Sequence, residues 1–166
     1  MNLSKLFSDK GYLQKQIDFF IKNKQIKRIE SNPELVKSYL EKAKHNLNFF
    51  ILNKNQENYK DWQIVALYYS LYHASLALIT NKNYHSKNHQ ATILLLIKEY
   101  SISKDEAELI NDLSINKGEA QMYTQLKKDR HDASYSTEIK FTKEIINKYQ
   151  REVIRFINKT EMILGF

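Results

Sequence analysis

Hydrophobic residues along this chain recur mainly at spacings of three and four positions, the period of an α-helix that buries one face. The clearest series begins after Asn32 and Pro33, a residue that can cap a helix and a proline suited to the first helical turn. This series predicts a helix over residues 33–53. Its buried face would consist of Val36, Leu40, Ala43, Leu47 and Phe50.

The stretch "DWQIVALYYSLYHASLALI", residues 61–79, is apolar on most sides of a helix, which is typical of a helix inside a bundle. One face would carry Trp62, Val65, Tyr69, His73, Leu76 and Ala77. The following "NKNYHSKNH" is a polar connection, and Ser86 is suited to cap the next helix, which is expected to end near Tyr100.

Other helices are predicted at both ends of the chain and in its second half. Ser103 and Glu106 form a capping-box pattern, and the helix that they start should bend or break at Lys117 and Gly118 and then resume through Met122 and Leu126. Further helices are expected over residues 3–8, 11–28 and 142–163, the last preceded by "STEIKF" as a short extended link.

Turn-forming residues are scarce, since the 166 residues include three glycines and one proline. Strands and hairpins need more of them, so we expect an all-α protein. A chain of this length can bury about 70% of its unfolded surface as one domain. No repeat or linker divides it, and we therefore expect a single domain with an N-terminal helical arm (1–30) and a core bundle (31–163).

Composition narrows the classes of function. The chain has no cysteine, which excludes disulfides, thiolate zinc sites and cysteine nucleophiles and fits a reducing cytosol. No apolar run reaches membrane-spanning length and no signal-peptide pattern is present, so we expect a soluble cytoplasmic protein that does not bind membranes. The net charge of +7 favours an anionic partner such as nucleic acid.

Cofactor and metal sites are not expected. The isolated glycines cannot form either phosphate-binding glycine fingerprint. His85 and His89 are the only close histidine pair, and no carboxylate lies within that stretch. Because a metal would need more ligands than two imidazoles, a polar surface connection explains this pair better.

The stretch "LKKDRHDASYST", residues 126–137, concentrates groups that can do chemistry. Arg130 offers a bidentate fork for phosphate, His131 a nitrogen that titrates near neutral pH, and Tyr135 a hydroxyl. These groups suit metal-free RNA cleavage, and they equally suit the charged C-terminal end of a helix. Neighbouring residues could bind phosphate (Lys127, Lys128) or orient the cations (Asp129, Asp132).

Two further groups have open roles. His73 follows Tyr69 by one helical turn on the apolar helix, where it could be a core histidine or a base that faces a cleft. Arg151 and Arg155 share the outer face of the last helix, as a solvated surface or as a ridge that contacts phosphate. No alternation of basic and aromatic residues selects a tyrosine for stacking on bases.

Taken together, three stretches resemble the HEPN (higher eukaryotes and prokaryotes nucleotide-binding) family. "LYYSLYHASLAL" (67–78) is similar to the family's "AYYAxFHAALAL", "SKNHQATI" (86–93) to "SKSHxGVI", and "RHDASY" (130–135) to "RxxADY". The resemblance spans about residues 30–163. It implies an antiparallel helical bundle and a homodimer whose polar motifs meet in a basic cleft.

The resemblance also implies metal-independent endoribonuclease activity, in a toxin paired with a minimal nucleotidyltransferase antitoxin. Arg130 falls on the family's phosphate-binding arginine, but Tyr135 stands where the ribonuclease motif has its histidine. The base would then be His131, His73 or a group of the partner subunit. The alternative is a non-catalytic HEPN module that binds nucleotide, RNA or the nucleotidyltransferase.

Overall fold

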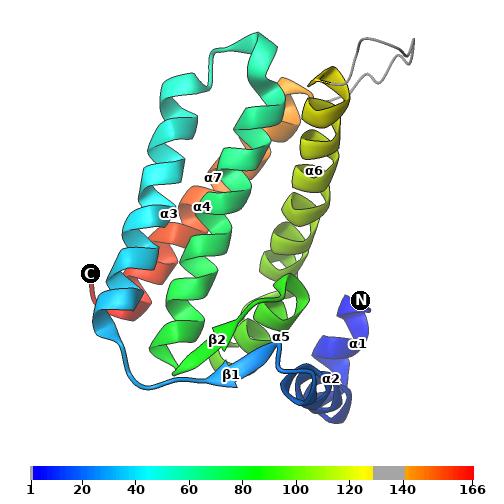
Figure 1. Ribbon diagram of the computed structural model, residues 1–166, viewed down its shortest axis with the longest axis vertical. Helices are drawn as coiled ribbons and strands as arrows, with labels where there is room; N and C mark the ends of the chain where they lie inside the picture. Colours follow the sequence, from blue (N-terminus) through cyan, green and yellow to red (C-terminus); the bar gives the residue numbers. More distant parts are fainter. Residues whose placement is uncertain (1, 129–140) are drawn as a thin grey trace.

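The computed structural model describes residues 2–118 in full, the helical backbone of 119–128, and residues 141–166. Long helices form a bundle whose successive members run in opposite directions, as Figure 1 shows. The all-α expectation is confirmed, apart from one very short sheet. The long helices are α3 (Pro33–Asn53), α4 (Lys60–Asn81), α6 (Lys104–Lys128) and α7 (Lys143–Leu164).

Helix α4 lies at the centre of the bundle and packs against α3, α6 and α7. Apolar residues are buried on it from Ile64 through Leu71 to Leu78, as its sequence predicts, whereas Trp62 in its first turn is exposed. A short 3-10 turn, η1 (Glu57–Tyr59), connects it to α3. Because α4 has neighbours on several sides, its one partly exposed face is the place where it can meet a ligand.

The N-terminal arm differs from its predicted form. Helices α1 (Leu3–Ser8) and α2 (Lys10–Lys22) are present, but the helix expected over 11–28 ends at Lys22, so this prediction is wrong for its last turns. Lys24 adopts a left-handed conformation with φ of 58°, which reverses the chain. Residues Ile26–Arg28 then form β1, which pairs antiparallel with β2 (Tyr84–Ser86).

Strand pairing at this position has a clear physical reason. Ile26 is 2% exposed and lies opposite Ser86 in the sheet. At the other end of β1, the Arg28 guanidinium lies 3.8 Å from the centroid of the Tyr84 ring and donates to its hydroxyl at 2.6 Å. Packing and a cation–π contact therefore outweigh the weak helical preference of this lysine-rich segment.

The segment after α4 also differs from its predicted form. Helix α5 (His89–Tyr100) is capped by Asn88, whose Oδ1 accepts from the Ala91 amide at 3.1 Å, and Ser86 belongs to β2 instead. The polar connection thus contains a strand, and α5 begins at His89. Consequently His89 lies in the first turn of a helix that faces the core.

Helix starts elsewhere agree with the sequence. Ser103 and Glu106 form the predicted capping box, with N–H to side-chain distances of 2.8 and 3.1 Å, and Thr142 caps α7. The break predicted at Lys117 and Gly118 does not occur, because α6 continues through both residues. Most of "STEIKF" lies outside the described residues.

One hydrophobic core joins the arm to the bundle. Leu6, Ile17, Phe20 and Ile26 of the arm belong to the same buried cluster as the central residues of α4, α5 and α7. Within the described part of the chain, no helix is both long enough and apolar enough to cross a membrane.

Candidate functional site

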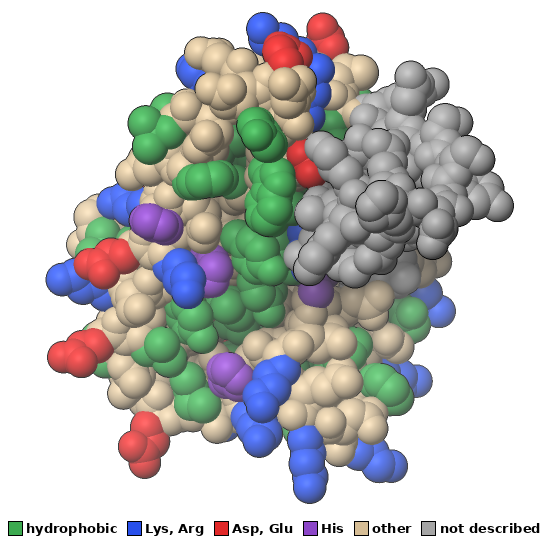
Figure 2. Space-filling model, turned by 45° about the horizontal axis from the view of Figure 1, so that its top comes forward, with side chains coloured by type: hydrophobic (Ala, Val, Ile, Leu, Met, Phe, Trp, Pro, Cys, Tyr) green, Lys and Arg blue, Asp and Glu red, His purple; other side chains and the backbone are tan. Residues whose placement is uncertain are grey.

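An aromatic cluster occupies the partly exposed face of α4 and extends onto α3 and α5. Its members are Tyr39, Tyr68, Tyr69, Tyr72, His73 and His89. Figure 2 shows hydrophobic side chains gathered in a hollowed band on this side of the molecule, with histidine and lysine side chains beside it. The cluster brings two of the three motif stretches, residues 67–78 and 86–93, into direct contact.

His89 lies against the rings of Tyr68 and Tyr72, at centroid distances of 5.9 and 6.0 Å. Both of its ring nitrogens are buried, and neither makes a hydrogen bond of ordinary geometry within the described structure. Burial lowers the pKa of His89 to about 4, against the opposing effect of the Ile110 carbonyl. His89 is therefore a neutral, occluded imidazole at neutral pH.

His73 has a different environment in the same cluster. Its Nδ1 lies 2.7 Å from the Tyr69 carbonyl oxygen, which can only accept, so we assign the proton to Nδ1 and the lone pair to Nε2. Asn46 Nδ2, which donates to the Lys42 carbonyl, lies 3.2 Å from the same nitrogen. Burial, opposed by the Tyr69 carbonyl, lowers the pKa of His73, and the Lys42 ammonium adds to this effect. His73 is thus neutral at neutral pH with Nε2 ready to accept a proton.

Two tyrosine hydroxyls of the cluster, those of Tyr68 and Tyr72, remain protonated at neutral pH. Burial raises the pKa of Tyr68 to about 12, against the opposing effect of the Ser114 side chain. Burial likewise raises the pKa of Tyr72, and the Thr92 side chain opposes this effect. The side chains of Tyr68, Tyr72, His73 and His89 therefore carry no charge near pH 7. The positive charge near the cluster comes from lysines.

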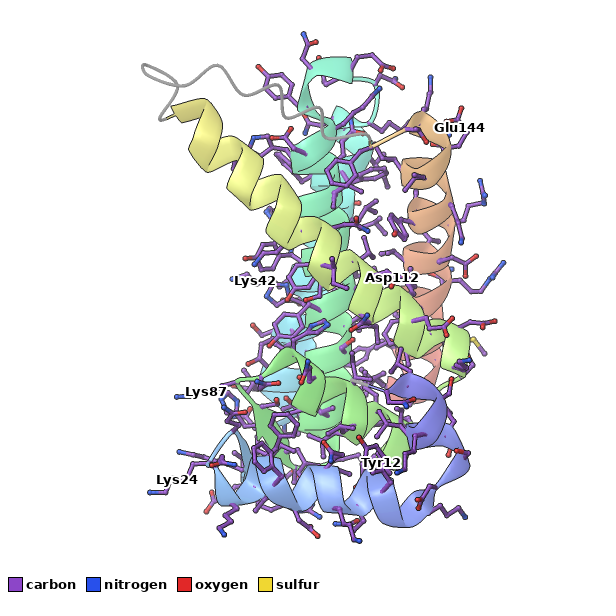
Figure 3. All side chains as sticks on the ribbon, turned by 90° about the vertical axis from the view of Figure 1, so that its right-hand side faces the viewer. Tyr12, Lys24, Lys42, Lys87, Asp112 and Glu144 are labelled. Atoms are coloured by element: carbon purple, nitrogen blue, oxygen red, sulfur yellow. The ribbon has the colours of Figure 1, made fainter. Side chains whose placement is uncertain are left out.

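Two lysines lie beside the cluster. Lys117 of α6 places its Nζ 5.3 Å from the Tyr68 ring centroid and 5.6 Å from that of Tyr69. Lys42 of α3 is close enough to His73 to lower its pKa. Figure 3 shows Lys42 on the side of the bundle towards which the C-terminal half of α6 leans. The arrangement combines aromatic surface with positive charge, which suits an aromatic anion.

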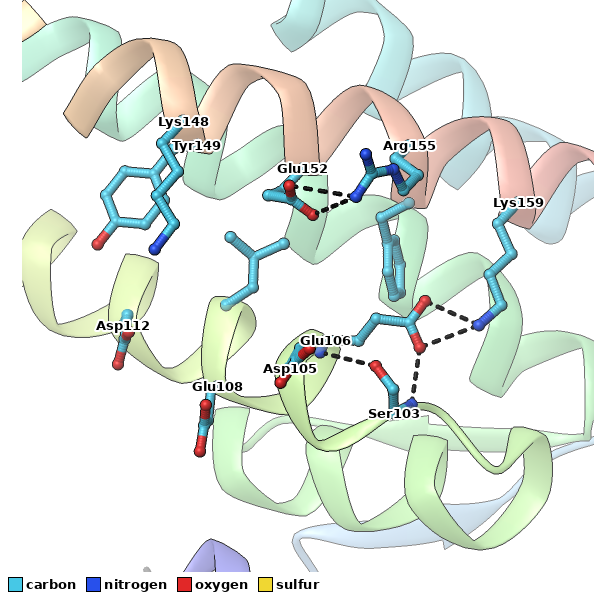
Figure 4. A pocket seen from close by; sticks show the side chains of 12 residues that line it. Ser103, Asp105, Glu106, Glu108, Asp112, Lys148, Tyr149, Glu152, Arg155 and Lys159 are labelled. Carbon is cyan, nitrogen blue, oxygen red and sulfur yellow. Dashed lines mark hydrogen bonds and ion pairs between the residues drawn. The ribbon is translucent and has the colours of Figure 1, made fainter. Parts of the chain in front are cut away.

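A second candidate is the groove between α6 and α7, which has a volume of about 520 Å³ (Figure 4). Two of its cations are paired: Lys159 Nζ lies 2.7 and 2.9 Å from the Glu106 oxygens, and Arg155 donates to Glu152 at 3.0 and 3.2 Å. Carboxylates outnumber cations among its lining residues, which include Asp105, Glu106, Glu108, Asp112, Glu152, Lys148, Arg155 and Lys159. This groove is poorly suited to a phosphate.

The predicted site residues are only partly visible. Arg130, His131, Tyr135, Asp129 and Asp132 lie outside the described residues, and the side chains of Lys127 and Lys128 are likewise not described. Their predicted roles stay predictions. Arg151 and Arg155 are exposed on α7, and Arg155 is held by Glu152. Tyr69 and His73 lie together in the aromatic cluster.

Sequence analysis did not identify Tyr39, Lys42, Lys117 or His89 as site residues. Tyr39 and Lys42 come from a helix recognised only by its buried stripe, and Lys117 was expected at a helix break. Only the position of His89 inside "SKNHQATI" could have indicated a role. The described residues contain no group of three or more metal-ligating side chains.

Two comparisons, with protein-family models and with curated proteins, found no match to this chain. The aromatic cluster and the three motif stretches are therefore the features of this chain that indicate a function.

Proposed function

We propose that the protein is a HEPN-type, RNA-directed endoribonuclease that works without metal at the cleft of a cytoplasmic homodimer. It would act as a toxin whose partner is a minimal nucleotidyltransferase antitoxin. The observation that carries the proposal is the contact of His89, from "SKNHQATI", with Tyr68 and Tyr72, from "LYYSLYHASLAL". Two motif stretches that resemble the family thus form one surface.

The third motif stretch follows directly on α6, the helix that carries Lys117 against this surface. In the proposed reaction, the ribose 2′-hydroxyl attacks its own phosphate, and the bond to the 5′-oxygen of the next nucleotide breaks. A base accepts the 2′-hydroxyl proton, an acid protonates the leaving oxygen, and Arg130 stabilises the phosphate charge. The products are a 2′,3′-cyclic phosphate and a 5′-hydroxyl.

His73 and His131 are the candidate bases of this chain. The lone pair of His73 at Nε2 fits the role, because a neutral imidazole can take up the proton at neutral pH. His89 does not fit it, since both of its ring nitrogens are buried. Tyr135 would donate a hydrogen bond to the phosphate.

The test is cleavage of varied RNAs by the full-length protein in EDTA. We expect products with cyclic phosphate ends, and Arg130→Ala should lower the rate by about 100-fold or more, as loss of a transition-state charge partner does. Arg130→Lys keeps the charge but removes the fork, and its rate should fall between the two. A contaminating nuclease would instead cleave equally in all three preparations.

The second candidate function is a non-catalytic HEPN module that binds RNA, nucleotide or the nucleotidyltransferase. The tyrosine at position 135, where the ribonuclease motif has histidine, favours it. Wild-type protein that binds RNA but cleaves none of the varied RNAs would establish this alternative and reject the ribonuclease.

A further inference from the structure

Three rings of the aromatic cluster form a row across the boundary of α3 and α4. Tyr39 and His73 have centroids 6.3 Å apart with ring planes at 27°, and Tyr69 and His73 are 5.9 Å apart at 29°. All three side chains are partly exposed. Rings in direct face-to-face contact lie closer, so these offset rings leave part of each face uncovered by its neighbour.

Positive charge near this row is not neutralised in the described structure. Neither Lys42 nor Lys117 has a carboxylate partner among the described residues, whereas Arg155 and Lys159 on α7 are each paired. The Lys117 ammonium instead lies over the rings of Tyr68 and Tyr69. Two ammonium groups are therefore available to an anion that reaches the aromatic row.

We propose that the row of Tyr39, His73 and Tyr69 is a stacking surface for an unpaired RNA base, whose flanking phosphates meet Lys42 and Lys117. The proposal deepens the proposed function, because it takes RNA as the ligand, but it does not require cleavage. The rings supply a sequence-tolerant platform for a base, and the ammonium groups supply the salt-sensitive contact to the backbone.

The chemistry of the row favours single-stranded RNA over other anions. In a duplex the faces of the bases are covered by their neighbours, so a duplex offers phosphates alone. An acidic peptide without aromatic residues would satisfy the lysines but leave the ring faces uncovered. His73 is neutral near pH 7, so the two lysines do not repel its ring. A neutral ring also suits stacking against an uncharged nucleobase.

Binding can be measured apart from cleavage with a 2′-O-methyl RNA oligonucleotide, which lacks the attacking hydroxyl. Fluorescence anisotropy of the labelled single strand and of its duplex with the complementary strand would give both affinities, with the full-length protein in EDTA. We expect the single strand to bind at least tenfold more tightly than the duplex. Equal affinities would overturn the proposal, whether or not natural RNA is cleaved.

Substitutions at Tyr69 locate the surface. Tyr69→Leu should weaken binding of the single strand about 5- to 100-fold through loss of base stacking, whereas Tyr69→Phe, which keeps the ring, should stay within about threefold. Lys117→Gln should weaken binding and reduce its dependence on salt. Tyr59→Leu is the matched control, because Tyr59 is 54% exposed and belongs to η1, outside the helices that carry the cluster.

The thermal transition of each variant is measured first, so that only folded variants are compared. Unchanged affinity of folded Tyr69→Leu would reject the stacking surface, and so would an equal loss in Tyr59→Leu. A wild-type protein that binds the 2′-O-methyl strand as expected but cleaves no natural RNA would reject the ribonuclease and leave the stacking surface supported. The two proposals can therefore fail separately.

Discussion

His73 and His89, the histidines of the two described motif stretches, differ in chemistry because their environments differ. His73 keeps a free lone pair at Nε2, whereas His89, in contact with Tyr72 of the same cluster, has both nitrogens buried. The sequence leaves both roles open for His73, but its prediction of a polar surface position for His89 is wrong. The error arose because the start of α5 was expected at Ser86, and capping at Asn88 turns His89 towards α4.

Burial of His89 predicts a loss of stability in mild acid. Its pKa of about 4 in the folded protein lies below the ordinary value of 6.5, so between these values the unfolded chain binds a proton that the folded chain does not. The free energy of unfolding should therefore fall as the pH drops through this window, by about 3 kcal/mol in total. Chemical denaturation at pH 7, 5.5 and 4.5 would measure it.

A substitution assigns this pH dependence to its source. His89→Leu removes the titrating group and should flatten most of the loss of stability between pH 7 and 4.5. If the His89 variant loses stability in acid as steeply as the wild type, the dependence belongs to other groups.

At the scale of single elements, local signals predicted helix starts well and long-range pairing poorly. The caps at Asn32, Ser103 and Thr142 are each encoded within four residues, and all three are confirmed. The pairing of β1 with β2 depends on contacts between segments far apart in the chain, such as Arg28 with Tyr84. No pattern within a window of one helix could reveal that contact.

Helix α6 continues through Gly118, where the sequence predicts a bend or break, and a substitution there can test why. Gly118 continues the helix, and a Cβ added there would meet no atom within 4 Å. Gly118→Ala should therefore raise the free energy of unfolding by about 0.5–1 kcal/mol, because alanine has the higher helix propensity. Thermal denaturation would show an increased midpoint. A decrease would mean that the helix needs the freedom of glycine at this position.

Gly165 is the matched comparison for that experiment. It ends α7 with a φ of 77°, a conformation that side chains rarely adopt, and its amide donates to the Glu161 carbonyl at 2.9 Å. Gly165→Ala should lower stability where Gly118→Ala raises it. Equal effects at the two positions would indicate a cause other than backbone conformation.

At the scale of the whole molecule, the N-terminal arm is part of the core. Ile17 and Phe20 of α2 are 1% and 8% exposed and belong to the same buried cluster as the centre of α4. Strand β1 then joins the arm to β2, immediately before the site helix α5. The sequence predicted the arm and its packing, but its strand could not be foreseen from periodicity.

This integration predicts that arm and bundle unfold together. Ile17→Ala should lower the free energy of unfolding by about 2–5 kcal/mol, the usual cost of truncating a buried isoleucine. Trp62, the sole tryptophan, belongs to the first turn of α4, and Figure 1 shows that α4 begins at the end of the bundle away from the arm. Its fluorescence and the far-ultraviolet circular dichroism should shift to the same lower midpoint, as one cooperative transition requires.

Ile21→Ala supplies the control on the same helix, because Ile21 is 47% exposed and its truncation should cost little. If the arm were an independent unit, Ile17→Ala would leave the Trp62 transition in place and move only part of the circular dichroism signal. Coincident shifts for Ile17→Ala, with neither signal moved by Ile21→Ala, would establish residues 1–30 as part of the single domain. Because β1 joins the arm to β2 (Tyr84–Ser86), which leads into α5, destabilising the arm would then also loosen the aromatic cluster.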